Sequence, residues 1–75
     1  MLQNLDAVKL GCVCSVVSVE TDAALKQRLQ AFGLIPGTKV QPEYRSPGGH
    51  AEVIRFRGTQ LCLRTQDLKN IRVEL

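Results

Sequence analysis

The chain has 75 residues, a formal charge of +3 at neutral pH and a hydrophobic fraction of 44%. A chain this short can offset the entropy of folding with one core only, so we expect a single domain over residues 1–75. The composition argues against disorder, and the positive charge is far below that of a dedicated nucleic-acid binder. No apolar stretch approaches the roughly 20 residues that cross a bilayer, and a signal-peptide pattern is absent, so we expect a cytoplasmic protein.

The first predicted elements are a strand and a helix. After a lead-in that ends at Gly11, residues 12–20 read CVCSVVSVE, with apolar residues on both faces as in a central barrel strand. Thr21 and Asp22 offer side-chain oxygens for a helix N-cap, and Gly33 is suited to end the same helix. Between them, three apolar residues recur at helical spacing: Leu25, Leu29 and Phe32. This segment is therefore predicted to be an α-helix.

The next predicted element is a strand that begins at about residue 38. Pro36 and Gly37 favour a sharp turn before it. Pro42 cannot donate a ladder hydrogen bond, so it places this strand at an edge of the sheet or at a bulge. If the strand is an edge, it offers a route to a homo-oligomer.

The last third of the chain is predicted to be a meander. Two strands follow a glycine-rich turn and are joined by a short connection at Gly58-Thr59; a helical turn at residues 65–70 and a last strand at 71–75 come after them. We expect a mainly β domain of about five strands with one α-helix and a short helical turn. The expected core includes Leu25, Leu29, Phe32, Phe56, Leu61 and Leu63.

The order of these motifs resembles that of the FeoA domain family over nearly the whole chain. A helix end, a glycine, a proline-glycine turn and a strand start follow one another without a spacer between residues 28 and 40. The matching positions are Arg28, Leu29, Gly33, Leu34, Pro36, Gly37, Pro47, Gly49, Gly58, Leu61, Leu63, Arg64, Ile71 and Val73. The chain departs from the family pattern at Phe32, where leucine is usual, and in the SPGGHA turn.

The resemblance implies both a fold and a function. FeoA proteins are small SH3-like β-barrels that accompany FeoB, the membrane ferrous iron transporter with a cytosolic G-domain. We therefore expect a non-enzymatic adaptor without a cofactor, which binds the cytosolic part of FeoB and regulates or stabilises it.

The partner-binding surface is expected at a rim where the turn after the helix, the following strand and the next loop come together. Its residues are Leu34, Ile35, Pro36, Tyr44, Arg45 and Pro47. Apolar residues that follow a helix often pack back on the core, so a core position for Leu34 and Ile35 is the alternative.

A metal site is the second functional hypothesis. Its candidate ligands are Cys12, Cys14, His50 and Cys62. The C-x-C pair lies in valine-rich strand sequence instead of on a turn, so its spacing is not that of a zinc site. We expect reduced thiols, a buried Cys14, a Cys62 that faces away from its leucine neighbours, and His50 exposed at a hairpin tip. No metal site is therefore predicted.

Catalysis and RNA binding are weaker alternatives. The single histidine has no evident acid-base partner, and the chain shows no nucleophile motif or phosphate-binding loop. Arg55, Arg57 and Arg64 fall on neighbouring strands and could contact RNA, but Tyr44 is the only plausible stacking residue because Phe56 is expected in the core. We expect no nucleic-acid partner.

Overall fold

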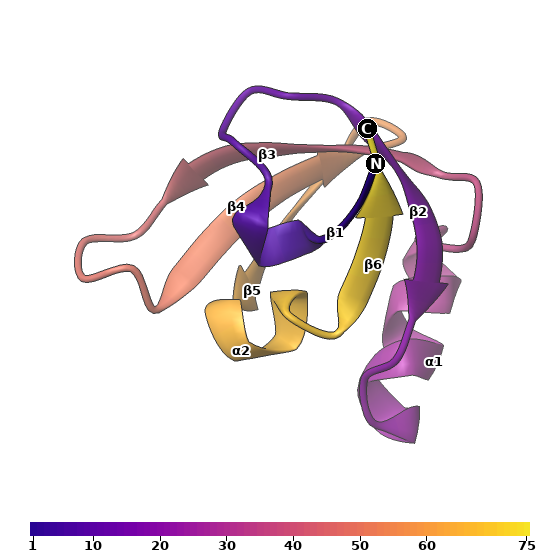
Figure 1. Cartoon of the computed structure of the whole chain (residues 1–75). Helices are drawn as coiled ribbons and strands as arrows, with labels where there is room; N and C mark the ends of the chain where they lie inside the picture. Colours follow the sequence, from indigo (N-terminus) through magenta and orange to yellow (C-terminus); the bar gives the residue numbers. More distant parts are fainter.

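The structure is a computed structural model that describes all residues, 1–75. Six strands, one α-helix, one short helix and one 3₁₀ turn follow one another along the chain (Figure 1). Their bounds are β1 Leu2–Asn4, η1 Leu5–Ala7, β2 Cys14–Val19, α1 Ala23–Phe32, β3 Lys39–Arg45, β4 Ala51–Phe56, β5 Thr59–Arg64, α2 Thr65–Leu68 and β6 Ile71–Glu74. Neither helix is long or apolar enough to cross a membrane.

The strands form one antiparallel sheet in the order β1-β6-β2-β3-β4-β5. β2 and β3 share only the pairs Cys14 with Val40 and Ser15 with Lys39, and the sheet folds over at this narrow junction. The domain is thus the expected mainly β, SH3-like barrel. Figure 1 shows β3 and β4 extending beyond the barrel as a long hairpin, while α1 lies beside β2 and β6.

The predicted number of strands was too low because the lead-in contains β1. Leu2 pairs with Glu74 and Asn4 with Arg72, so β1 lies on β6, the last strand of the chain. A strand of three residues has too few positions to show an alternating pattern. Its partner is also the most distant element in the sequence, which leaves no local hairpin motif to find.

The core is a single cluster of aliphatic residues with one aromatic ring. Its members are Leu5, Val8, Cys14, Val16, Val19, Leu29, Leu34, Val40, Ile54, Phe56, Leu63, Leu68, Ile71 and Val73, and Leu25 and Leu61 pack against it. The core positions predicted for Leu29, Phe56 and Leu63 are confirmed. That for Phe32 is wrong, because its side chain is 47% exposed.

The end of α1 explains why Phe32 is exposed and Leu34 is buried. The amide of Gly33 donates to the carbonyl of Gln30, and the amide of Leu34 donates to that of Leu29 at 2.8 Å. These two bonds form a Schellman motif, with Gly33 in the left-handed conformation at φ 98°. The motif reverses the chain direction and places Leu34 in the core. The apolar face of the helix therefore ends at Leu29, and Phe32 is left outside. The helix also begins as predicted, since Asp22 Oδ1 accepts from the Leu25 amide at 3.0 Å.

The prediction for the β4–β5 turn needs correction, and of the two positions predicted for Pro42 the bulge is confirmed. β4 and β5 are joined by Arg57-Gly58 instead of Gly58-Thr59, and both residues of this turn have positive φ, 50° and 75°. Pro42 lies at a bulge, where the β3–β4 register shifts before Tyr44. β3 is not an edge strand, because it pairs with both β2 and β4 and its Pro42 carbonyl accepts from the Gly11 amide. The predicted edge position of β3 is therefore wrong, and homo-oligomerisation stays a prediction.

Candidate functional site

The most prominent surface feature is the end of the β3–β4 hairpin, residues 43–52, which we call the hairpin arm (Figure 1). Tyr44 is 57% exposed on it, and Arg45 and Pro47 are exposed beside it. The tip is ordered by Ser46, whose amide donates to the Ala51 carbonyl at 2.9 Å and whose hydroxyl accepts from the Ala51 amide at 3.1 Å. The arm is therefore a defined surface that carries an aromatic side chain.

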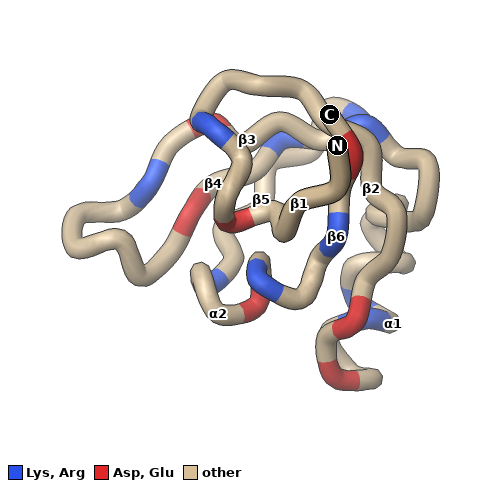
Figure 2. Tube along the Cα trace, viewed as in Figure 1, with Lys and Arg blue, Asp and Glu red and all other residues tan.

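A buried ion pair crosses the hairpin arm. Nε of Arg45 lies 2.9 Å from Oε1 of Glu52, whose side chain is fully buried, whereas that of Arg45 is 43% exposed. In Figure 2 basic and acidic positions lie on the two opposing strands of the arm. The other carboxylate oxygen of Glu52 has no hydrogen-bond partner. A buried carboxylate needs its charge partner, so this pair holds Arg45 to the core side of the arm.

Sequence reasoning missed Glu52. It lies on the same inward face of β4 as the buried Ile54 and Phe56. On the neighbouring strands it pairs with Arg45 of β3 and Leu63 of β5. The alternation in AEVIRF could have indicated a carboxylate on the core face. A buried carboxylate in a small core is unusual, and such groups are found where a partner of opposite charge is available.

The outer face of the arm continues across the sheet. Tyr44 pairs with Val53, and Val53 pairs with Cys62, so these three side chains form one row. In the next row Nε of Arg55 lies 2.8 Å from Oε2 of Glu43. The hydrogen bonds from Arg55 and Gln60 lower the pKa of the Glu43 carboxyl below its ordinary value of 4.5. This face is thus flanked by polar contacts that hold β3, β4 and β5 together.

The predicted rim does not form one surface. Leu34 is fully buried, so its expected surface position is wrong and the alternative, a core residue after the helix end, is correct. Ile35 is 42% exposed and Pro36 is exposed, but they lie in the turn before β3, whereas Tyr44, Arg45 and Pro47 lie at the other end of this strand (Figure 1). A strand of seven residues separates the two groups by about 20 Å.

The metal-ligand candidates are dispersed. Cys14 is buried and its thiol donates to the Val40 carbonyl, whereas Cys12 and Cys62 are exposed and free and His50 is exposed at the hairpin turn. Nowhere in the structure do three or more His, Cys, Asp or Glu side chains come close enough to hold a metal ion. Desolvation, with a smaller contribution from the neighbouring Cys12, raises the pKa of the Cys14 thiol to about 11. The predicted burial of Cys14 and the outward direction of Cys62 are confirmed.

The three arginines proposed for RNA lie in different surroundings. Arg55 is bound to Glu43, and the side chain of Arg57 lies over Gly33 at the end of α1. Arg64 instead lines a hollow beside α2. Phe56 is buried as predicted, so Tyr44 is the exposed aromatic side chain of this sheet.

Comparison with known proteins identifies the family. The family model described as the FeoA domain matches residues 3–75. The solution structure of the FeoA protein from Chlorobium tepidum is 27% identical, with a TM-score of 0.94; the match covers 97% of this chain and 70% of that one. The FeoA-like protein from Clostridium acetobutylicum is 26% identical with a TM-score of 0.84, over 99% of this chain and 86% of the other. No curated protein sequence matches the chain.

A third relative connects the fold with a role. The zinc complex of FeoA from Stenotrophomonas maltophilia is 26% identical with a TM-score of 0.82, over 99% of this chain and 89% of that one. It is described as a prokaryotic SH3 domain protein and a candidate ferrous iron transport activating factor. A manganese-dependent transcriptional repressor, 14% identical with a TM-score of 0.85, shares the fold over 41% of its length. Since the FeoA model matches almost the entire barrel, this chain belongs to the FeoA family.

Proposed function

We propose that this chain is a non-enzymatic accessory protein that works in the cytosol by binding the cytosolic part of the ferrous iron transporter FeoB. In this proposal it regulates or stabilises the transporter through contact. The observation that carries the proposal is the exposed Tyr44 on a hairpin arm that a buried ion pair holds in place. Membership of the FeoA family, and the description of the S. maltophilia relative, support the link to ferrous iron transport.

The chemistry of the arm is that of a protein contact. A tyrosine ring contributes a large contact area at a small entropic cost, and aromatic and arginine side chains are enriched where a few residues carry most of the binding energy. Arg45 uses Nε to bind Glu52, and its side chain remains 43% exposed, so the rest of the guanidinium is available to a partner. Pro47 adds a rigid apolar residue at the tip. Tyr44 on the outer face, Arg45 on the opposite face and Pro47 at the tip together make the end of the arm the proposed contact surface.

Calorimetric titration with the isolated cytosolic part of FeoB tests the proposal. Truncating a central aromatic residue costs about 2 kcal/mol, so Tyr44→Ala is expected to weaken binding by more than tenfold. Its melting temperature should remain that of the wild type, because the side chain is 57% exposed.

Ile35→Ala is the matched control, since Ile35 is 42% exposed at the opposite end of β3. Normal affinity for Tyr44→Ala together with lost affinity for Ile35→Ala would move the contact to the turn after α1. No binding by the wild-type protein would reject FeoB as the partner.

A further inference from the structure

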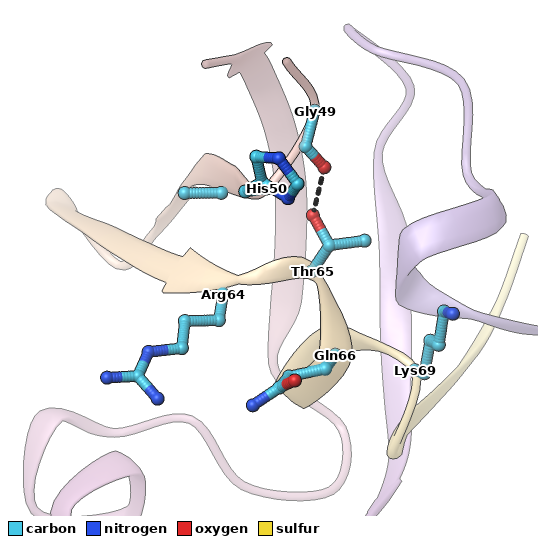
Figure 3. A pocket seen from close by; sticks show the side chains of 7 residues that line it. Gly49, His50, Arg64, Thr65, Gln66 and Lys69 are labelled. Carbon is cyan, nitrogen blue, oxygen red and sulfur yellow. Dashed lines mark hydrogen bonds between the residues drawn. The ribbon is translucent and has the colours of Figure 1, made fainter. Parts of the chain in front are cut away.

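A hollow of about 590 Å³ lies between the returning side of the hairpin turn and α2 (Figure 3). Its lining residues are Gly49, His50, Ala51, Arg64, Thr65, Gln66 and Lys69. Thr65 connects the two walls, because its hydroxyl donates to the Gly49 carbonyl at 2.8 Å and its amide donates to the His50 carbonyl at 2.9 Å. The hollow is thus built by two segments that are distant in the sequence and fixed to each other.

The charges of this hollow are unbalanced. Arg64 and Lys69 both line it, neither forms a salt bridge, and no carboxylate is among the lining residues. The side chains of His50 and Gln66 also form no hydrogen bond within the chain. Arg64 and Gln66 also line the neighbouring groove, which contains Asp22, Asp67 and Arg28, and neither carboxylate is within salt-bridge distance of Arg64. Two unpaired cations thus border a hollow that contains no carboxylate, which suits an anionic ligand.

The distribution of donors indicates which anion fits. Phosphate sites use clusters of free backbone amides, but here the amides of Gly49, Thr65 and Lys69 already donate to carbonyl groups of the chain. The lining contains no Phe, Tyr or Trp, and the imidazole of His50 is its one ring, so successive nucleobases have no series of rings on which to stack. In Figure 3 the side chains of Arg64 and Lys69 extend to different sides instead of converging on one point. Separate cations of this kind match several carboxylates spaced along a chain better than one compact phosphate.

We propose that this hollow binds an acidic segment of a protein partner, with Arg64 and Lys69 each contacting a carboxylate of that segment. Gln66 on α2 and His50 on the hairpin arm add hydrogen bonds to the segment. The inference rests on the proposed function, because it extends the contact surface of Tyr44 and Arg45 along the hairpin turn to α2. Opposite charges of this kind mainly set orientation and association rate, and they lose strength as salt is added.

Fluorescence anisotropy with a labelled short polyglutamate peptide tests the hollow directly, with polyglutamine as the uncharged comparison. The wild-type protein should bind polyglutamate only, and amide shifts in an NMR titration should concentrate at residues 49–51 and 64–69. The double variant Arg64→Gln with Lys69→Gln should bind the peptide roughly tenfold more weakly. The double variant Arg64→Lys with Lys69→Arg keeps both charges and should preserve most of the binding.

The matched control removes two charges elsewhere, with Lys26→Gln on α1 and Lys39→Gln on β3, and it should bind the peptide almost as the wild type does. Equal loss in both double variants would overturn the proposal, because the peptide would then sense net charge alone. So would absence of peptide binding, or pyrophosphate that binds at these residues more tightly than the peptide.

The same proteins are then titrated with the cytosolic part of FeoB. If the wild type binds polyglutamate at the hollow but does not bind FeoB, the proposed partner fails and the acidic-segment site stands. If the wild type binds FeoB and the Arg64/Lys69 glutamine variant binds it equally well, the accessory function stands and the hollow has no part in that contact.

Discussion

The two ends of β3 differ in how the chain closes them. At the start, α1 ends in a Schellman motif and Leu34 is fully buried, and the Thr38 hydroxyl donates to the Gly33 carbonyl and accepts from the Ile35 amide. At the other end, a charged pair crosses the hairpin arm, one carboxylate oxygen of Glu52 has no partner, and Tyr44 lies exposed. The first arrangement stabilises the fold. The second exposes an aromatic ring and leaves a buried carboxylate oxygen without a partner.

The largest expected effect on stability is at the start of β3. Leu34→Ala should lower the free energy of unfolding by about 3 kcal/mol, because it removes a fully buried side chain and leaves a cavity beside Leu29. Urea denaturation measures this loss, and Tyr44→Ala at the other end should change it by less than about 0.5 kcal/mol. Similar losses for the two variants would remove the contrast between the ends of β3.

The next effect concerns the arm. Arg45→Ala leaves the buried Glu52 carboxylate without its charge partner and should cost about 2 kcal/mol, less than a fully buried pair because Arg45 is 43% exposed. Adding Glu52→Gln to this variant removes the unpaired charge, so the double variant should be more stable than Arg45→Ala alone. A double-mutant cycle by urea denaturation gives the coupling, and strict additivity of the two changes would show that the pair does not hold the arm.

A smaller effect on stability separates backbone strain from packing at the end of α1. Gly33→Ala should cost about 1–2 kcal/mol, because φ is 98° and the new Cβ would lie 3.0 Å from Cδ of Arg57. Gly37→Ala is matched in φ, 94°, but its Cβ would meet no atom within 4 Å. Thermal melts should therefore show the greater loss for Gly33→Ala. Equal losses would mean that Arg57 moves away freely.

The smallest effect is a dependence on pH at the arm. The pKa of Glu43 is lowered in the folded protein by the hydrogen bonds from Arg55 and Gln60, so its contribution to stability is complete above the ordinary value of 4.5. This contribution is lost as the pH falls through the lower, folded-state pKa. Melts between neutral and acidic pH should show a shallower acid decline for Glu43→Gln than for the wild type. Parallel declines would show that the carboxylate contributes nothing measurable.

The sequence was sufficient for elements whose determinants are local. Asp22 and Gly33 mark the two ends of α1 through side-chain and backbone chemistry that needs no tertiary context, and the motif order around them led to the correct family. Phe32 was expected in the core and Leu34 at the surface, and the structure has the reverse. The helical periodicity alone does not show which residues are buried once the chain reverses at Gly33. The rim was misplaced for a related reason, since the turn before β3 and the tip after it are close in sequence but a full strand apart in space.

Other features depend on distant partners. β1 exists only because β6 lies beside it, and the hollow at α2 forms only when Thr65 meets the hairpin turn. The burial of Glu52 could be read from alternation, but its pairing with Arg45 depends on the register of β3 against β4.

That register depends on a single extra residue. Pro42 faces Ile54 and Tyr44 faces Val53, so Glu43 has no opposite residue on β4. If Glu43 instead took the place opposite Val53, every later position of β3 would change sides: Tyr44 would lie opposite Glu52 and face the interior, and Arg45 would lie opposite Ala51 and face outward. The bulge therefore decides that the outer face of the arm carries an aromatic side chain, and a loss of the bulge by a shift of register would exchange that aromatic surface for a charged one while keeping the barrel.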